Sequence, residues 1–274
     1  MCGIAGYSVD RASRMDRTLT AQALFASIAE RGSDAVGYAY RGDESGVVVH
    51  KQRTGASQLL EAVAIPGDAT ESLLHVRDYT KGHPSLSANN HPIRHGTVVG
   101  IHNGIIANDE EIFEQHSFDR AEPGMTVDSE AIFALVDESG AQRNSLEELY
   151  GSMATAWLDE REGDVLFLAR GVGRPLWIGE GEGETLFAST LDALELAEAY
   201  ARLSLHKREV PEGCLVTVRA GRVVAAESFE PDRSFSEEPL PAVRAPAERA
   251  SCLERLGILA QRRYGAIGIS AAAR

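Results

Sequence analysis

The chain has 274 residues, of which 43% are apolar and 25% are charged, and it carries a formal net charge of −14. This is the composition of a globular protein with room for one large domain or two small ones. The excess of acidic residues argues against the basic footprint of a nucleic-acid-binding surface and, more weakly, against an anionic membrane surface.

No segment approaches the roughly 18 consecutive apolar residues of a membrane-spanning helix, and no basic-then-apolar leader opens the chain. The three cysteines, Cys2, Cys214 and Cys252, are far apart and form no CxxC pair. Neither a disulfide framework nor a zinc ribbon is therefore predicted. We expect a cytoplasmic protein, in which thiols stay reduced.

In the first half of the chain, apolar spacing predicts strands and helices in irregular order. The strands are expected at residues 4–9, 37–40, 47–49, 72–76 and 97–101. The helices are expected at residues 18–30, 58–63, 109–115, 128–136 and 145–150, the fourth with an Asp-Ser cap. Residues 42–46 have the composition of a turn, and residues 77–96 predict a long irregular loop of the kind that is usually functional or disordered.

The second half is richer in strands. They are expected at residues 153–158, 164–169, 175–178, 186–188, 214–219 and 222–228, with helices at 191–201 and 247–263. Because hairpins replace regular β-α-β alternation, we expect an α+β fold with antiparallel sheets and helices outside. The Pro-, Glu- and Ser-rich residues 231–246 predict a linker, so we expect one domain at 2–230 and an extension at 231–274.

Cys2 directly follows the initiator methionine, and its side chain is small enough for that methionine to be removed. The new first residue would carry both a thiol, which is nucleophilic as a thiolate, and an α-amine with a pKa of about 7.7–8.0 that can accept a proton. The alternative is that Cys2 is an ordinary small residue at a frayed terminus.

Three polar clusters stand at predicted strand ends or in loops. Arg77 can bind a carboxylate through its planar fork, with the Thr80 hydroxyl nearby, or it makes a local ion pair. Asn103 and Gly104 can form an oxyanion hole or a plain Asn-Gly turn. Asp128 can bind an ammonium group, cap a helix, or do both.

Five histidines fall within one stretch of 28 positions, namely His75, His83, His91, His95 and His102. None has the close spacing of metal ligands, and no acidic residue completes such a motif. We therefore expect neither a metal site nor a cofactor.

Taken together, six short motifs resemble the ordered motifs of class II glutamine amidotransferase domains. They are MCGIAG at residues 1–6, RGSDAVG at 31–37, HVR at 75–77 with Thr80 and Gly82, NHP at 90–92, HNGIIAN at 102–108 and DSE at 128–130. The segment LFAST at residues 186–190 also looks like a later motif of that family. The resemblance covers roughly residues 2–230.

The resemblance implies an N-terminal-nucleophile hydrolase fold, a four-layer αββα sandwich with two stacked antiparallel sheets. It implies that Cys2 attacks the side-chain amide of glutamine and that its own α-amine is the general base. Asn103 and Gly104 would stabilise the oxyanion, while Arg77 and Asp128 would hold the α-carboxylate and α-ammonium groups of the substrate.

The resemblance also assigns substrate contacts to Thr80, Asn90 and His91, and it makes residues 89–92 a mobile flap over glutamine. One departure is Asp78, where the family often has an aromatic or apolar residue. An acid there could weaken the hold of Arg77 on the substrate or orient it.

Residues 231–274 are far fewer than the ammonia-consuming domains to which family members are often fused. We therefore expect either a free glutaminase or a separate synthetase partner that accepts the ammonia. The helix at 247–263, with Arg255, Arg262 and Arg263, could dock that partner, or it could pack on its own domain.

Two alternatives to glutamine hydrolysis remain from the sequence. One is a hydrolase of the same fold that acts on another amide, such as a γ-glutamyl compound. The other is a non-catalytic regulatory subunit.

Overall fold

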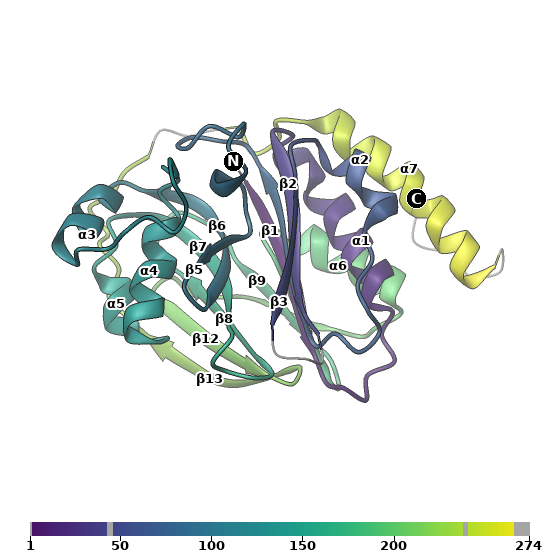
Figure 1. Cartoon of the computed structure of the whole chain (residues 1–274). Coiled ribbons are helices and arrows are strands. Elements are labelled where there is room, and N and C mark those ends of the chain that lie inside the picture. Colours follow the sequence, from purple (N-terminus) through teal and green to yellow (C-terminus); the bar gives the residue numbers. More distant parts are fainter. Residues whose placement is uncertain (1, 43–45, 238–240, 266–274) are drawn as a thin grey trace.

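The computed structural model describes residues 2–42, 46–237 and 241–265. Within these residues the strands form a seven-stranded sheet and a six-stranded sheet, and all strand pairs are antiparallel. The sheets stack face to face, with helices on both outer sides (Figure 1). The centre of the turn expected at 42–46 lies outside the described residues.

The first sheet has the strand order β11-β9-β10-β1-β4-β2-β3. Its strands are β1 (Gly3–Val9), β2 (Ala35–Arg41), β3 (Val47–Gln52), β4 (Glu71–Arg77), β9 (Trp177–Glu180), β10 (Glu184–Ala188) and β11 (His206–Glu209). The first strand of the chain therefore lies in the middle of the sheet, where Gly3 is opposite Val76 of β4 and Ala5 is opposite Ala188 of β10.

The second sheet has the order β13-β12-β8-β7-β6-β5. Its strands are β5 (Ile93–His95), β6 (Val98–Ile106), β7 (Gly151–Asp159), β8 (Val165–Arg170), β12 (Cys214–Arg219) and β13 (Arg222–Ser228). β6 pairs with β7 along its whole length, with Val98 opposite Asp159 and Ile106 opposite Gly151.

Helices cover the outer face of each sheet. The first sheet is covered by α1 (Arg17–Ile28), α2 (Ala56–Leu59), α6 (Leu191–Ala201) and α7 (Pro246–Tyr264). The second is covered by α3 (Asp109–Gln115), α4 (Glu130–Ser139) and α5 (Arg143–Glu147). Short 3₁₀ turns occupy residues 29–31, 60–62 and 87–89. None of the described helices is both long and apolar enough to cross a bilayer.

The apolar core lies in three layers, one under each helical layer and one between the sheets. The middle layer takes side chains from both sheets, including Ile4, Leu73, Val99 and Ile101, all fully buried. Because side chains alternate along a strand, the residues in phase with these four also point between the sheets. The expected four-layer αββα sandwich is confirmed.

Three elements differ from the sequence prediction. β6 continues past residue 101 to Ile106, so Asn103 and Gly104 lie inside a strand that pairs with β7. β5 falls within the loop expected at 77–96. β11 was not predicted, because its sequence His-Lys-Arg-Glu has no apolar alternation, and it is a strand only through its pairing with β9 at the sheet edge.

The predicted helix near the C-terminus is present as α7, and it packs on the first helical layer. Cys252, Leu256 and Ala260 are buried in the core that α1 and α6 also line. Arg255 forms an ion pair with Glu61 (2.8 Å), and Arg263 one with Asp16. The helix thus packs on its own domain, one of the two expected alternatives, and these two exposed arginines form ion pairs within the chain.

Candidate active site

Cys2 lies immediately before β1, in phase with the buried Ile4, so its side chain points between the sheets. Its thiol donates to the carbonyl oxygen of Asp78 (3.4 Å), and its own carbonyl accepts from Nε of Arg31 (2.9 Å). Burial raises the pKa of the Cys2 thiol, while the positive charge of Arg77 acts in the opposite direction. The thiol is thus held as a neutral group beside an arginine.

A small cavity of about 10 Å³ adjoins Cys2, enough for about one water molecule. Its lining includes six of the eight residues that the sequence assigned to the site. The residues around it are Cys2, Arg77, Asp78, Tyr79, Thr80, Lys81, His91, His102, Gly104, Val127, Asp128 and Ser129. The structure therefore brings together the residue before β1, the end of β4 with the loop that follows it, β6 and the segment before α4.

Arg77 ends β4 and is 2% exposed. Its Nη1 donates to Oδ1 of Asn90 (2.5 Å), and its Nη2 donates to the carbonyl oxygens of Lys81 (2.8 Å) and Gly82 (2.5 Å). Gly32 lets the chain approach this strand end closely, because a Cβ there would lie 2.4 Å from the Arg77 carbonyl oxygen. The guanidinium group thus sits beneath the loop after β4, with part of its fork bonded to that loop.

Asn103 is in phase with Val99 and Ile101, so its side chain points between the sheets and is fully buried. Neither its amide nitrogen nor its amide oxygen has a hydrogen-bond partner among the described residues. Gly104 has φ +151°, and a Cβ there would lie 1.9 Å from the Ser152 carbonyl oxygen. A buried amide without a partner is costly, so this arrangement indicates a place for a ligand rather than a plain turn.

Asp128 is 3% exposed, and its carboxylate accepts the backbone N–H of Ile106 in β6 (2.8 Å). Burial raises its pKa from 3.8 to about 6, and the nearby charge of Asp109 acts in the same direction. α4 begins only at Glu130, with Ser129 at the N-cap position and no side-chain capping bond. The expected Asp-Ser cap is therefore wrong, since the Ser129 hydroxyl lies instead 2.9 Å from Nδ1 of His102.

Three histidines form a buried group at the cavity, which His91 and His102 line. The rings of His75 and His91 stack with centroids 4.1 Å apart, and Nε2 of His75 lies 3.0 Å from the His102 carbonyl oxygen. Burial lowers the pKa of His75 and of His102 to about 3 and also lowers that of His91. These imidazoles are neutral at pH 7. The described residues contain no group of three or more His, Cys, Asp or Glu side chains that could hold a metal ion.

The segment expected to form a mobile flap, residues 89–92, is buried and fixed. Asn90 bonds to both Arg77 and the Pro84 carbonyl, and Oδ1 of Asn89 accepts the N–H groups of Thr126 and Val127. These hydrogen bonds hold Asn89 and Asn90 against the core, which argues against a flap at these two residues, whereas the ring nitrogens of His91 have no hydrogen-bond partner among the described residues. The exposed residues of the loop are Tyr79, Thr80, His83, Ser85 and Ser87.

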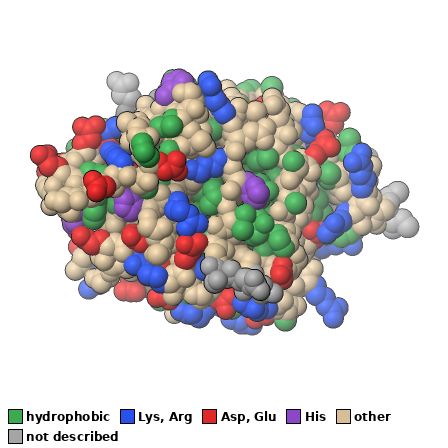
Figure 2. Space-filling view, viewed as in Figure 1, with side chains coloured by type: hydrophobic (Ala, Val, Ile, Leu, Met, Phe, Trp, Pro, Cys, Tyr) green, Lys and Arg blue, Asp and Glu red, His purple; other side chains and the backbone are tan. Residues whose placement is uncertain are grey.

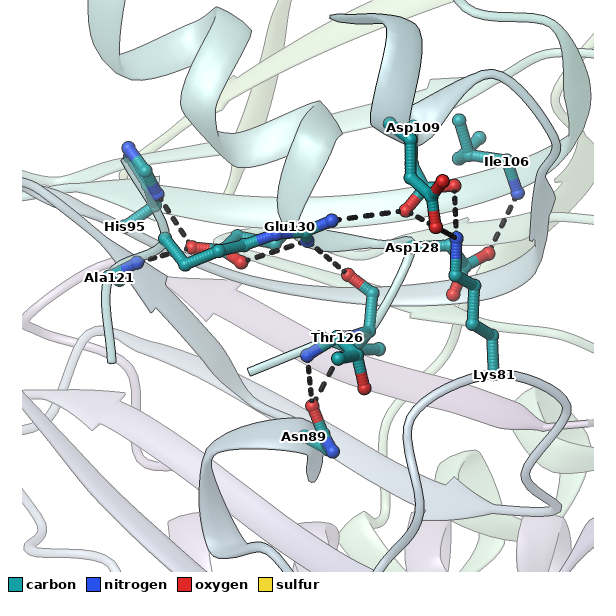
Figure 3. A network of polar contacts seen from close by, with 12 residues as sticks. Lys81, Asn89, His95, Ile106, Asp109, Ala121, Thr126, Asp128 and Glu130 are labelled. Carbon is teal, nitrogen blue, oxygen red and sulfur yellow. Dashed lines mark hydrogen bonds and ion pairs between the residues drawn. The ribbon is translucent and has the colours of Figure 1, made fainter. Parts of the chain in front are cut away.

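Lys81, which the sequence reasoning passed over, links the cavity to a network of charges (Figure 3). Its ammonium group contacts Asp109 (2.7 Å) and Glu110 (3.0 Å) at the start of α3. Arg120 joins Asp109 (3.3 Å) to the fully buried Glu130 (3.1 Å). Lys81 lies between the motif residues Thr80 and Gly82, and Arg31 begins the motif at residues 31–37. Their place in these motifs is the sequence feature that could have marked them as residues near the site.

On the face drawn in Figure 2, acidic and basic side chains are interspersed. Such a surface differs from the basic stripe of a nucleic-acid-binding protein.

Comparison with known proteins agrees with this geometry. Residues 72–196 match the family model of the glutamine amidotransferase domain. Glutamine–fructose-6-phosphate aminotransferase [isomerizing] of Caulobacter vibrioides is 35% identical over 208 residues, which cover 71% of this chain and 32% of that protein. The Thermus thermophilus enzyme of the same name is 33% identical over 249 residues, covering 85% and 39%. The chain thus spans about a third of the length of these curated relatives.

Solved structures share the fold. The glutamine phosphoribosylpyrophosphate amidotransferase of B. subtilis, complexed with ADP and GMP, has a TM-score of 0.64 at 20% identity and covers 84% of this chain and 49% of that one. A glutamine aminotransferase class-II domain protein from Silicibacter pomeroyi has a TM-score of 0.53 at 18% identity and covers 84% and 100%.

Two stacked antiparallel sheets between helical layers give the chain the fold of the N-terminal-nucleophile hydrolases. More specifically, it carries a domain of the class II glutamine amidotransferase family, homologous to known enzymes.

Proposed function

We propose that the protein hydrolyses the side-chain amide of glutamine, with Cys2 as nucleophile after removal of Met1. The observation that carries this proposal is that Cys2, Arg77, Gly104 and Asp128 surround one cavity. Beside Gly104, Asn103 contributes a buried amide that has no partner among the described residues.

The general base is the α-amine of Cys2 itself. The buried imidazoles of His75 and His102 have pKa values of about 3, and burial also lowers the pKa of His91, so these rings are too weakly basic to take a thiol proton at pH 7. An α-amine has a pKa of about 7.7–8.0, so a useful fraction of it is neutral at that pH. The raised pKa of the Cys2 thiol fits a nucleophile that stays neutral until this base takes its proton.

The reaction proceeds in two halves. The Cys2 thiol passes its proton to the α-amine, and the sulfur attacks the amide carbon to form a tetrahedral intermediate. The amide of Asn103 and the backbone N–H of Gly104 stabilise the oxyanion. The protonated amine then gives its proton to the leaving nitrogen, and ammonia departs. Water, deprotonated by the same amine, attacks the thioester and releases glutamate and the free thiol.

Arg77 and Asp128 select a free amino-acid head group through opposite charges. Arg77 binds the α-carboxylate and Asp128 the α-ammonium, whose positive charge favours the ionised form of this carboxyl. Thr80 and His91 line the same cavity, and Asn90 orients Arg77 through its hydrogen bond. Because the cavity holds about one water molecule, the loop after β4 must move before glutamine enters.

The ammonia acceptor is a separate synthetase subunit in this proposal. Its support is that the matching curated relatives are named glutamine–fructose-6-phosphate aminotransferases, enzymes that pass the nitrogen of glutamine to an acceptor. We place the protein in the cytoplasm, where its three free cysteines stay reduced.

Glutamate release from glutamine tests the proposal, with Cys2→Ala expected to abolish it and Cys214→Ala as the matched control. Mass spectrometry of the mature protein should show Cys2 as the first residue. Turnover of γ-glutamyl compounds with no turnover of glutamine would favour the alternative amide hydrolase. No release by wild type, with or without its partner, would favour a regulatory subunit.

A further inference from the structure

Asp78, which departs from the family pattern, has two separate contacts that matter for the site. Its backbone carbonyl accepts the thiol proton of Cys2 (3.4 Å). Its carboxylate turns the other way and forms an ion pair with Nε of Arg244, in the tail before α7 (3.3 Å). One residue therefore joins the tail to the nucleophile.

The tail is fixed at this point by its backbone as well. The N–H groups of Arg244 and Ala245 both donate to the carbonyl oxygen of Glu30 (2.8 and 2.9 Å). Glu30 directly precedes Arg31, whose side chain binds the carbonyl of Cys2. α7 begins at the same end of the sandwich as the N-terminus (Figure 1). The tail thus contacts Asp78, whose carbonyl accepts from the Cys2 thiol, and Glu30, the chain neighbour of Arg31.

A second anchor ties the tail to the other sheet. Glu237 forms an ion pair with the buried Arg174 and accepts the hydroxyl proton of Ser152 (2.8 Å). The Ser152 oxygen in turn accepts the N–H of Ile105 (3.2 Å), the residue after Gly104. The tail therefore has contacts on both sides of the site, through Asp78 to Cys2 and through Ser152 to the residue after Gly104.

We propose that the described tail, residues 231–237 and 241–245, is a positioning element of the active site, in which Arg244 holds Asp78 so that the Asp78 carbonyl orients the Cys2 thiol. This inference rests on the proposed function for its meaning in catalysis. It also gives a role to Asp78, whose carboxylate pairs with Arg244 of the tail.

The effect on Cys2 is both geometric and electrostatic. The charged groups that act on its thiol are Arg77, Arg31 and Asp78. Loss of Arg244 removes one positive partner of Asp78 and frees the loop that carries the accepting carbonyl. The thiolate then becomes harder to form, and the thiol loses its fixed direction.

The test uses the full chain with Arg244→Ala, Arg244→Lys, Asp78→Asn and the Asp78→Asn/Arg244→Ala double variant. The matched control is Arg255→Ala, which removes the ion pair between α7 and Glu61; neither residue lines the cavity. Two quantities are measured: the kcat and KM of glutamate release, and the pH profile of Cys2 alkylation by iodoacetamide, resolved from the other cysteines by peptide mass spectrometry.

We expect Arg244→Ala to lower kcat about tenfold with a smaller change in KM, since small displacements of a reacting group are costly. Alkylation of Cys2 should shift to higher pH, and Arg244→Lys should restore much of both. Adding Arg244→Ala to Asp78→Asn should have little further effect, because Arg244 acts through Asp78. Additive effects, or an Arg244→Ala profile equal to that of Arg255→Ala, would overturn the proposal. Because alkylation needs no substrate, absence of glutaminase activity in wild type would refute the function alone.

Discussion

Asp128→Asn should stabilise the protein at neutral pH although it removes a proposed substrate contact. The carboxyl is buried, and its pKa is raised from 3.8 to about 6, so its ionised form is disfavoured in the folded state. Asparagine keeps an oxygen that can accept the N–H of Ile106 but carries no charge. Functional sites commonly keep such destabilising groups.

The sign and size follow from linkage. Below pH 3.8 the carboxyl is protonated in both the folded and unfolded states, so it costs nothing. As pH rises, the unfolded chain releases this proton first, and stability is lost until the pH passes about 6. Over that window the loss amounts to about 3 kcal/mol, which is fully present at pH 7.

The assay is urea denaturation of wild type and Asp128→Asn at pH values from 4 to 8. The variant should exceed wild type by nearly nothing at pH 4 and by about 3 kcal/mol at pH 7, a rise of several degrees in Tm. Asp68→Asn, at an exposed position before β4, is the control and should follow wild type. A difference that does not change with pH, or that shrinks as pH rises, would refute the reasoning.

Three further predictions concern the site and the tail. Gly104→Ala places a Cβ 1.9 Å from the Ser152 carbonyl oxygen, so it should separate β6 from β7. The free energy of unfolding in urea should fall by at least about 2 kcal/mol, and glutamate release should be abolished. Normal activity of the variant would contradict the close approach. Leu256→Ala should lower the free energy of unfolding in urea by about 2–5 kcal/mol, because the Leu256 side chain on the inner face of α7 is fully buried. Ile258→Ala, at an exposed position of the same helix, should leave it nearly unchanged. The KM for glutamine should rise about tenfold from pH 7 to 5 as Asp128 takes up a proton, and a constant KM would argue against its role with the ammonium group.

Local features of the fold were predictable from the sequence. Residues 109–115 and 191–201 are helical as expected, and the hairpin of β12 and β13 was found because its apolar pattern flanks a turn at Ala220 and Gly221. Elements created by tertiary pairing were not predictable. β11 is polar throughout, and β6 extends through an Asn-Gly pair that in isolation favours a turn.

The candidate site shows the same division. Its cavity residues could be named from ordered motifs, because each motif is short and contiguous. The partners that hold them could not, since Lys81 meets Asp109 and Asp78 meets Arg244 only in the folded chain. Nor does composition reveal that residues 89–91 are buried, because Asn and His are usually exposed or intermediate.

The central position of β1 has a consequence for the order of folding. The strand that starts beside Cys2 pairs on one side with β10, and the N–H of Ile4 donates to the Ser189 hydroxyl, 185 positions further along. Contacts of such high sequence separation form late, because the loop-closure entropy is lost before they stabilise the fold. During synthesis, β1 lacks one neighbour until β10 has left the ribosome, and Cys2 lacks its tail support until Arg244 has followed. Cys2, the proposed nucleophile, is therefore among the first residues to be made and among the last to reach its folded environment.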